Sequence, residues 1–180
     1  MDQVKPRVAT VWMGGCSGCH MSLLDMDERL LELAGRMDLV YGPLLDVKEF
    51  PEAVDVTLVE GAIANEDHLA LIRTVRQRTK LLVALGDCAV TGNVTALRNV
   101  FGEAGLVLTH VYGAGAPGRR PAGPDSVVPR LLDRVWPVHQ VVDVDLFLPG
   151  CPPSADIIHF VLSELLDGRT PDLTGRLRFG

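Results

Sequence analysis

The sequence is poor in the features that mark membrane, exported and nucleic-acid-binding proteins. None of its apolar runs approaches the roughly 18 residues that a membrane-spanning helix needs, and the N-terminus shows neither a signal-peptide pattern nor a twin-arginine pair. The formal net charge is −6, and the notable basic clusters, RQRTK and GRRP, are short. A nucleic-acid-binding domain normally carries a basic patch or stripe. We therefore expect a cytoplasmic protein that binds no membrane and no nucleic acid.

Aromatic side chains are also scarce, at 5% of the chain, and no repeat or low-complexity tract is present. Apolar residues make up 47% and charged residues 22%, a balance that excludes a disordered chain and favours a globular one. A length of 180 residues suffices for one core of respectable size and is short for two domains. The sequence predicts one domain over residues 1–168 and a loosely ordered C-terminal tail over residues 169–180.

Short β-branched runs alternate with helical patterns, which predicts an α/β fold with a mainly parallel sheet and helices on both faces. Asn65 and Ser154 are expected to cap the helices that they precede, and Gly35 and Gly168 to end helices. Residues 102–126, rich in Gly and Pro, are expected to form a long loop. Strands are predicted at 7–13, within 37–46, and at 54–63, 80–89 and 141–153, and helices at 20–36, 65–79, 93–101 (weak), 126–135 (short, capped by Ser126) and 154–168.

All four cysteines follow predicted strands. Cys16 and Cys19 come after the first strand, Cys88 after the run KLLVALGD, and Cys151 after VDLFLPG. Since the carboxyl ends of parallel strands share one edge of a sheet, we expect the four thiols to converge there. Disulfides are rare in the cytoplasm, and isolated free cysteines are often buried as small hydrophobic side chains. The shared position favours a common metal site over four structural cysteines.

Three chemistries remain open for these cysteines. A redox dithiol would use the pair in GGCSGC but leaves Cys88 and Cys151 unexplained. Structural zinc usually pairs two C-x2-C units, and this chain has one such unit. An iron–sulfur cluster uses all four thiols, and flanking glycines leave room for its bulk and direct backbone N–H groups at sulfur. The sequence favours the cluster, and its flanking glycines are Gly14, Gly15, Gly18, Gly86 and Gly150.

Four segments in order, GGCSGCHMSLLDMDERL, VEGAI, LGDCAVTGN and LPGCPPSAD, resemble the cluster-binding core of nickel–iron hydrogenase small subunits. The resemblance covers almost the whole chain and is above all to the short small subunits of cytoplasmic NAD-reducing (bidirectional) hydrogenases. It implies a flavodoxin-like domain that holds one [4Fe–4S] cluster. The ligands that the resemblance implies are Cys16, Cys19, Cys88 and Cys151.

The resemblance also implies partners. In this family the nickel–iron centre belongs to the hydrogenase large subunit, and electrons pass on to diaphorase subunits that carry FMN and further Fe–S clusters and reduce NAD⁺. This chain has no cysteine after Cys151, whereas uptake-type small subunits carry an export signal and two further clusters. Relatives that reduce coenzyme F420 often append other cluster motifs. The implied role is therefore a relay of electrons through one cluster.

Other functions stay open. The closest alternatives are the small subunit of another multi-subunit [NiFe]-hydrogenase and the related subunit of NADH:quinone oxidoreductase, although that subunit typically has adjacent cysteines where this chain has CSGC. A flavodoxin-like FMN carrier needs a Ser/Thr/Gly-rich phosphate loop after its first strand, where this chain places cysteines. A zinc-stabilised scaffold needs only the four thiols.

Glu60, at the end of a predicted strand, is expected at the same sheet edge as the cysteines. It would tune the cluster or anchor a partner, or else cap backbone N–H groups as a loop carboxylate. Gly15, Gly18 and Gly150 are expected beside it around the cluster. His20, next to Cys19, is expected to be hydrogen-bonded within the chain, with contact to the partner or cluster as the alternative.

Overall fold

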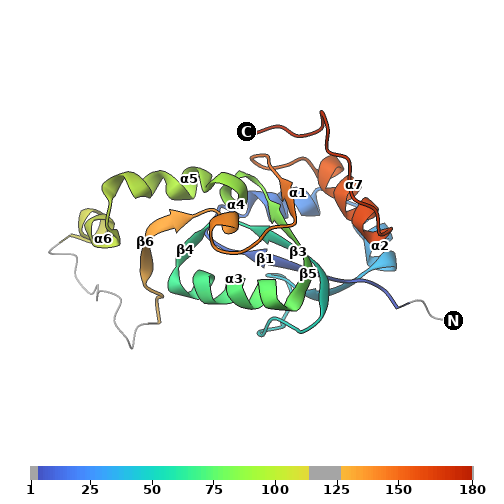
Figure 1. The fold of residues 1–180 in the computed structure, drawn as a ribbon, viewed down its shortest axis with the longest axis horizontal. Coiled ribbons are helices and arrows are strands. Elements are labelled where there is room, and N and C mark those ends of the chain that lie inside the picture. Colours follow the sequence, from blue (N-terminus) through green and yellow to red (C-terminus); the bar gives the residue numbers. More distant parts are fainter. Residues whose placement is uncertain (1–3, 114–126, 180) are drawn as a thin grey trace.

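The structure, a computed structural model, describes residues 4–113 and 127–179. Its centre is a sheet of five parallel strands in the order β2-β1-β3-β5-β7 (Figure 1). Numbered within this sheet alone, the order is 2-1-3-4-5, the order of flavodoxin-like folds. The predicted fold class is confirmed. The strands are β1 (Arg7–Trp12), β2 (Asp38–Tyr41), β3 (Val54–Glu60), β5 (Thr79–Leu85) and β7 (Leu146–Leu148).

Helices cover both faces of the sheet, with α3 (Glu66–Arg78) on one face and α1 (Gly18–Leu24), α2 (Arg29–Arg36) and α7 (Ala155–Leu166) on the other (Figure 1). Strand side chains alternate between the two faces, so each face has its own core. Val59 of β3 packs in the core that contains Ile72 of α3, whereas its neighbour Leu58 packs in the core that contains Ile158 of α7. No helix in the described part of the chain is long and apolar enough to span a membrane.

Local capping sets the ends of the long helices as predicted. The Asn65 side chain accepts the backbone N–H of His68 at 2.8 Å before α3, and the Ser154 hydroxyl accepts that of Ile157 at 3.4 Å before α7. Each bond satisfies a backbone donor that has no partner within the first helical turn. Gly168 follows α7 with φ 71°, the left-handed conformation that commonly ends a helix.

The predicted single helix over residues 20–36 is wrong, because α1 and α2 are separate. Turns occupy residues 25–28 between them, and Asp27 adopts φ 52°. A residue in the left-handed region cannot continue a right-handed helix. Gly35 does not end α2, which runs to Arg36 and stops where Met37 becomes extended.

The segment after β5 extends to one end of the molecule (Figure 1). It contains α4 (Asp87–Thr91), followed by α5 (Asn93–Ala96) and the 3-10 helix η1 (Leu97–Phe101), where a weak helix is predicted. The next helix, α6 (Ala104–Tyr112), lies where the sequence predicts a loop. Most glycines and prolines of that predicted loop come after Tyr112, so the stretch before them is free to be helical. The rest of the predicted loop, 114–126, lies outside the described residues.

The predicted helix over 126–135 is also wrong. Ser126, its predicted cap, lies outside the described residues, and β6 (Leu131–Trp136) pairs antiparallel with β4 (Ile63–Asn65), a short strand that the sequence does not predict separately. The pairing buries Val135 to 2% exposure against Ala62 and Ala64. The partner strand lies far away in the sequence, so local periodicity does not reveal it. A short 3-10 helix, η2 (Val138–Gln140), leads from β6 toward β7.

Residues 169–179 contain neither helix nor strand. They are held to α7 by Arg176, whose guanidinium lies 4.3 Å from the centroid of the Phe160 ring, a stacking that arginine makes readily on aromatic faces.

Candidate metal centre

The four cysteines lie at the carboxyl edge of the parallel sheet, in three segments that each follow a strand. Cys16 and Cys19 follow β1, the latter inside α1; Cys88 lies in α4 directly after β5; and Cys151 follows β7. Cys19 and Cys88 are buried, whereas Cys16 and Cys151 are exposed. The sheet thus brings cysteines that are up to 135 positions apart, from 16 to 151, to one edge. This edge is accessible from outside the protein, because two of the cysteines are exposed.

Hydrogen bonds fix these loops to one another. The Asp87 backbone N–H donates to the Gly150 carbonyl at 2.9 Å, and the Gly150 N–H donates to the Asp87 carboxylate at 2.6 Å. The Ser22 hydroxyl of α1 donates to the Pro153 carbonyl at 2.5 Å. The loop of Cys151 is therefore bonded both to the loop of Cys88 and to the helix of Cys19, and the cysteine positions depend on one another.

The thiols also act on one another electrostatically. Burial raises the pKa of the Cys19 thiol well above its usual range, and the negative charges of Glu60 and of the other three cysteines raise it further. Burial likewise raises the pKa of Cys88, to which the two exposed cysteines add. A cationic group bound among these cysteines would favour the thiolate form of Cys19 and Cys88 and so offset the raised pKa of both.

Glycines leave space beside two of the sulfurs. A Cβ at Gly86, whose φ is 81°, would overlap the Sγ of Cys19. A Cβ at Gly18 would lie 3.2 Å from the Sγ of Cys16, and the Gly18 N–H donates to that same sulfur at 3.4 Å. Gly15 lies beside Gly61 and the Glu60 carboxylate instead of beside a thiol. Backbone approach and an N–H donor at sulfur are both features that suit an iron–sulfur site.

Within the described residues, no group of three or more His, Cys, Asp and Glu side chains is arranged so that it could hold a single metal ion. A zinc ion contacts each thiolate at about 2.3 Å and so requires its ligands to meet around one point. A four-iron cluster is a larger body whose cysteine ligands stand at its corners, farther apart. The four-thiol donor set fits a cluster, and no arrangement within the described residues suits a single zinc ion.

Glu60 anchors the helix that carries Cys19. Its side chain, 2% exposed at the end of β3, accepts the N–H of His20 at 2.9 Å and that of Cys19 at 3.4 Å, and it also pairs with the Nδ1 of the His20 ring. Glu60 is expected from the sequence either to tune the cluster or anchor a partner, or to cap backbone N–H groups. The contacts in the structure are those of a carboxylate that caps backbone N–H groups. They hold α1 at a fixed distance from the end of β3.

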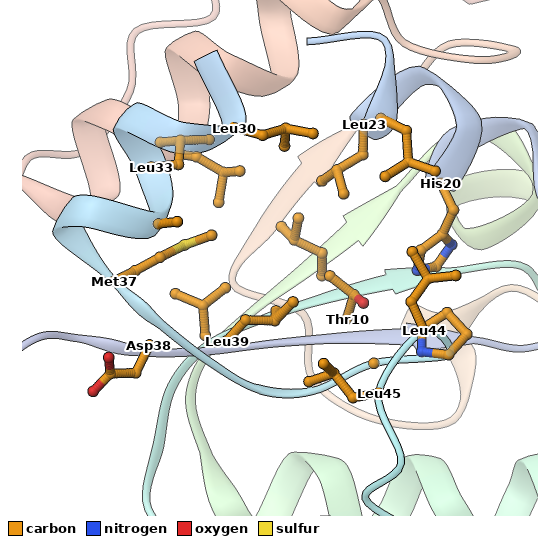
Figure 2. Close-up of a pocket in the computed structure, with 17 residues that line it drawn as sticks. Thr10, His20, Leu23, Leu30, Leu33, Met37, Asp38, Leu39, Leu44 and Leu45 are labelled. Carbon is orange, nitrogen blue, oxygen red and sulfur yellow. The ribbon is translucent and has the colours of Figure 1, made fainter. Parts of the chain in front are cut away.

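A cavity of about 480 Å³ lies beside this region, on the side of the sheet that α1 and α2 cover. Leucines of α1 and α2 face those of β2 and its following loop across it, and the His20 ring reaches into one end (Figure 2). The Nε2 of His20 is buried there and has no hydrogen-bond partner among the described residues. The lining holds Asp38 but no Lys or Arg, so the cavity lacks the positive charge that would favour a flavin phosphate.

Three residues at the edge were not predicted as part of the site. Asp87 joins two loops as described above, Asn93 donates from its side-chain Nδ2 to the Cys151 Sγ at 3.5 Å, and Thr95 lies close enough to Cys88 to lower the pKa of that thiol. The sequence marks these residues only by their position, within LGDCAVTGN or two residues after it. Their contacts could not be predicted, because the residues that they contact lie on other segments of the chain.

The chain belongs to the family of the 20 kDa subunit of NADH ubiquinone oxidoreductase, whose family model matches residues 16–165. It is 41% identical, over 94% of its length and 82% of the relative's, to the NAD-reducing hydrogenase HoxS subunit delta of Cupriavidus necator. It is also 41% identical to a vhu F420-non-reducing hydrogenase chain of Methanococcus voltae, of which it spans 60%. A crystal structure of an NAD⁺-reducing [NiFe]-hydrogenase in the H2-reduced state contains a chain that superimposes with a TM-score of 0.90 at 41% identity, covering 98% of this chain and 99% of that one.

Proposed function

We propose that this chain is the electron-transfer small subunit of a cytoplasmic NAD-reducing nickel–iron hydrogenase, in which H2 and NAD⁺ give NADH and H⁺. In this proposal the chain holds one [4Fe–4S] cluster between the nickel–iron site of a large subunit and a diaphorase module that carries flavin and further Fe–S clusters. The observation that carries the proposal is the gathering of four thiols at one open sheet edge. The superposition on a chain of an NAD⁺-reducing [NiFe]-hydrogenase, with a TM-score of 0.90 at 41% identity, supports NAD⁺ as the acceptor.

The chemistry that such a cluster supplies when bound is one-electron transfer. The residues of this chain hold and orient it. Cys19 and Cys88 would bind on the buried side and Cys16 and Cys151 on the exposed side, which is the side that a partner subunit can approach. Glu60 fixes α1, and Asp87 fixes the loop of Cys151. The Gly18 N–H donates to the Cys16 sulfur and would help to orient that ligand.

The test is a Cys88→Ser variant of the whole complex, co-purified through a partner subunit. We expect iron on the wild-type subunit, with broad visible absorption and an EPR signal on reduction. The variant should lose that signal and the H2-dependent reduction of NAD⁺, while oxidation of NADH by the diaphorase with an artificial acceptor continues. Zinc in place of iron, flavin bands from this chain alone, or a Cys88→Ser variant with cluster and full activity would each overturn the proposal.

A further inference from the structure

Asn93, the first residue of α5, reaches across to the loop after β7. Its side-chain Nδ2 donates to the Cys151 Sγ at 3.5 Å, a contact between residues 58 positions apart. The chain turns sharply between α4 and α5, where Gly92 has φ 88° and Asn93 has φ 35°. Asparagine is among the few residues that adopt positive φ with little strain. The turn brings the half-buried Asn93 amide to the exposed thiol.

The same short helix reaches a second cysteine through Thr95. Burial raises the pKa of Cys88, and the neighbouring polar groups of Thr95 oppose that rise. The Thr95 hydroxyl also donates to the Gly14 carbonyl at 2.9 Å, and a hydroxyl has only one hydrogen to donate. Within residues 4–113 and 127–179, the side-chain amide of Asn93 has no acceptor other than the Cys151 sulfur, so this amide is the side-chain donor of α5 that binds sulfur.

We propose that Asn93 is a positioning residue that fixes the Cys151 sulfur and raises the reduction potential of the cluster held there. This inference rests on the proposed function. Reduction adds one electron, derived from H2, and no bond or proton at Asn93 changes. The added negative charge is shared by the ligand sulfurs, and a hydrogen bond to a charged acceptor is stronger than one to a neutral acceptor. The Asn93 amide therefore stabilises the reduced form more than the oxidised form.

The turn does not require the amide for itself. The backbone N–H of Asn93 donates to the Thr91 hydroxyl at 3.3 Å, and glycine adopts positive φ without strain. An Asn93→Gly variant therefore keeps the backbone and removes only the donor. An Asn93→Asp variant keeps the shape of the side chain and replaces the donor with a carboxylate. A matched control is Asn99→Ala on η1, because the Asn99 side chain bonds to the Val135 backbone and to no thiol.

The measurement is a redox titration of the whole complex followed by EPR, using the signal that a Cys151→Ser variant lacks. We expect both Asn93 variants to lower the midpoint potential. The equilibrium constant of reduction should fall by up to about tenfold, which corresponds to roughly 59 mV for a one-electron couple. Asn93→Asp should show the larger shift, and Asn99→Ala should leave the potential unchanged.

An unchanged potential in both Asn93 variants would overturn the inference, as would an equal shift in Asn99→Ala, which would mark a general loosening of the segment. Loss of iron from both Asn93 variants would assign Asn93 to cluster retention and overturn its role in the potential. Absence of any cluster on the wild-type subunit would instead overturn the proposed function itself.

Discussion

The carboxylate of Glu60 accepts the backbone N–H of His20 at 2.9 Å and pairs with the imidazole Nδ1 of that same residue. The two residues are 2% and 8% exposed. One buried side chain from the end of β3 thus fixes both the backbone and the side chain of a residue adjacent to Cys19.

Replacing Glu60 with alanine should destabilise the fold. The change leaves two buried backbone N–H groups and the His20 Nδ1 without acceptors, and a buried donor without a partner costs about 1 to 3 kcal/mol. The measurement is the thermal denaturation midpoint of the purified complex, which should fall. Glu49→Ala is the control, since Glu49 is exposed and such surface changes stay within about 0.5 kcal/mol. Equal midpoints for the two variants would contradict this role of Glu60.

Ser22→Ala should loosen the loop of Cys151. The Ser22 hydroxyl, 5% exposed, donates to the Pro153 carbonyl, and removing one partner of a buried bond costs about 1 to 3 kcal/mol. We expect faster loss of iron from the variant in the presence of a chelator. Ser163→Ala in α7 is a matched control, because the buried Ser163 hydroxyl has no hydrogen-bond partner in the part of the chain that the structure describes, and its removal relieves an unpaired polar group. Iron loss as fast in Ser163→Ala as in Ser22→Ala would refute the prediction.

Gly86→Ala should displace the Cys19 sulfur. The new Cβ would overlap that sulfur, and the backbone at Gly86 has φ 81°. Gly102→Ala separates steric overlap from backbone strain, because Gly102 has φ 83° but a Cβ there would meet no atom of the described residues within 4 Å. Both variants place an alanine at positive φ, which costs about 1 to 3 kcal/mol. We expect Gly86→Ala alone to lose iron content, and a complex that retains its iron would show that the sulfur can move aside.

Asp145→Asn should weaken the fold in a pH-dependent way. Desolvation raises the pKa of Asp145, but the hydrogen bonds from the Leu82 N–H and from Arg76 outweigh it and hold that pKa below its usual range. A depressed folded pKa stabilises the fold above the unfolded pKa, and this stabilisation is lost as the pH falls.

The stability difference between wild type and Asp145→Asn should therefore be full at neutral pH and shrink below about pH 5. Because the Asp145 side chain is 43% exposed, the effect at neutral pH is modest. The measurement is the urea midpoint as a function of pH. Asp46→Asn is the control, since its side chain is 97% exposed, and a difference for Asp145→Asn that persists unchanged into acid would contradict the assignment.

The sequence by itself determined the parts of this protein that depend on short-range physics. The alternation of β-branched runs with helical patterns predicted a parallel sheet with helices on both faces, and Asn65 and Ser154 predicted two helix starts, because capping uses atoms only three residues apart. It also placed each cysteine after a strand. Since parallel strands share a carboxyl edge, that placement sufficed to predict the convergence of the thiols.

Only the tertiary structure decided what depends on partners distant in the chain. Residues 131–136 form a strand because residues 63–65 offer an edge to pair with, and no local pattern reveals that edge. The pairing of Glu60 with His20 and the bond from Asn93 to Cys151 join residues 40 and 58 positions apart. The sequence could supply the four sulfurs, but the hydrogen bonds that orient them come from side chains whose neighbours are set by packing.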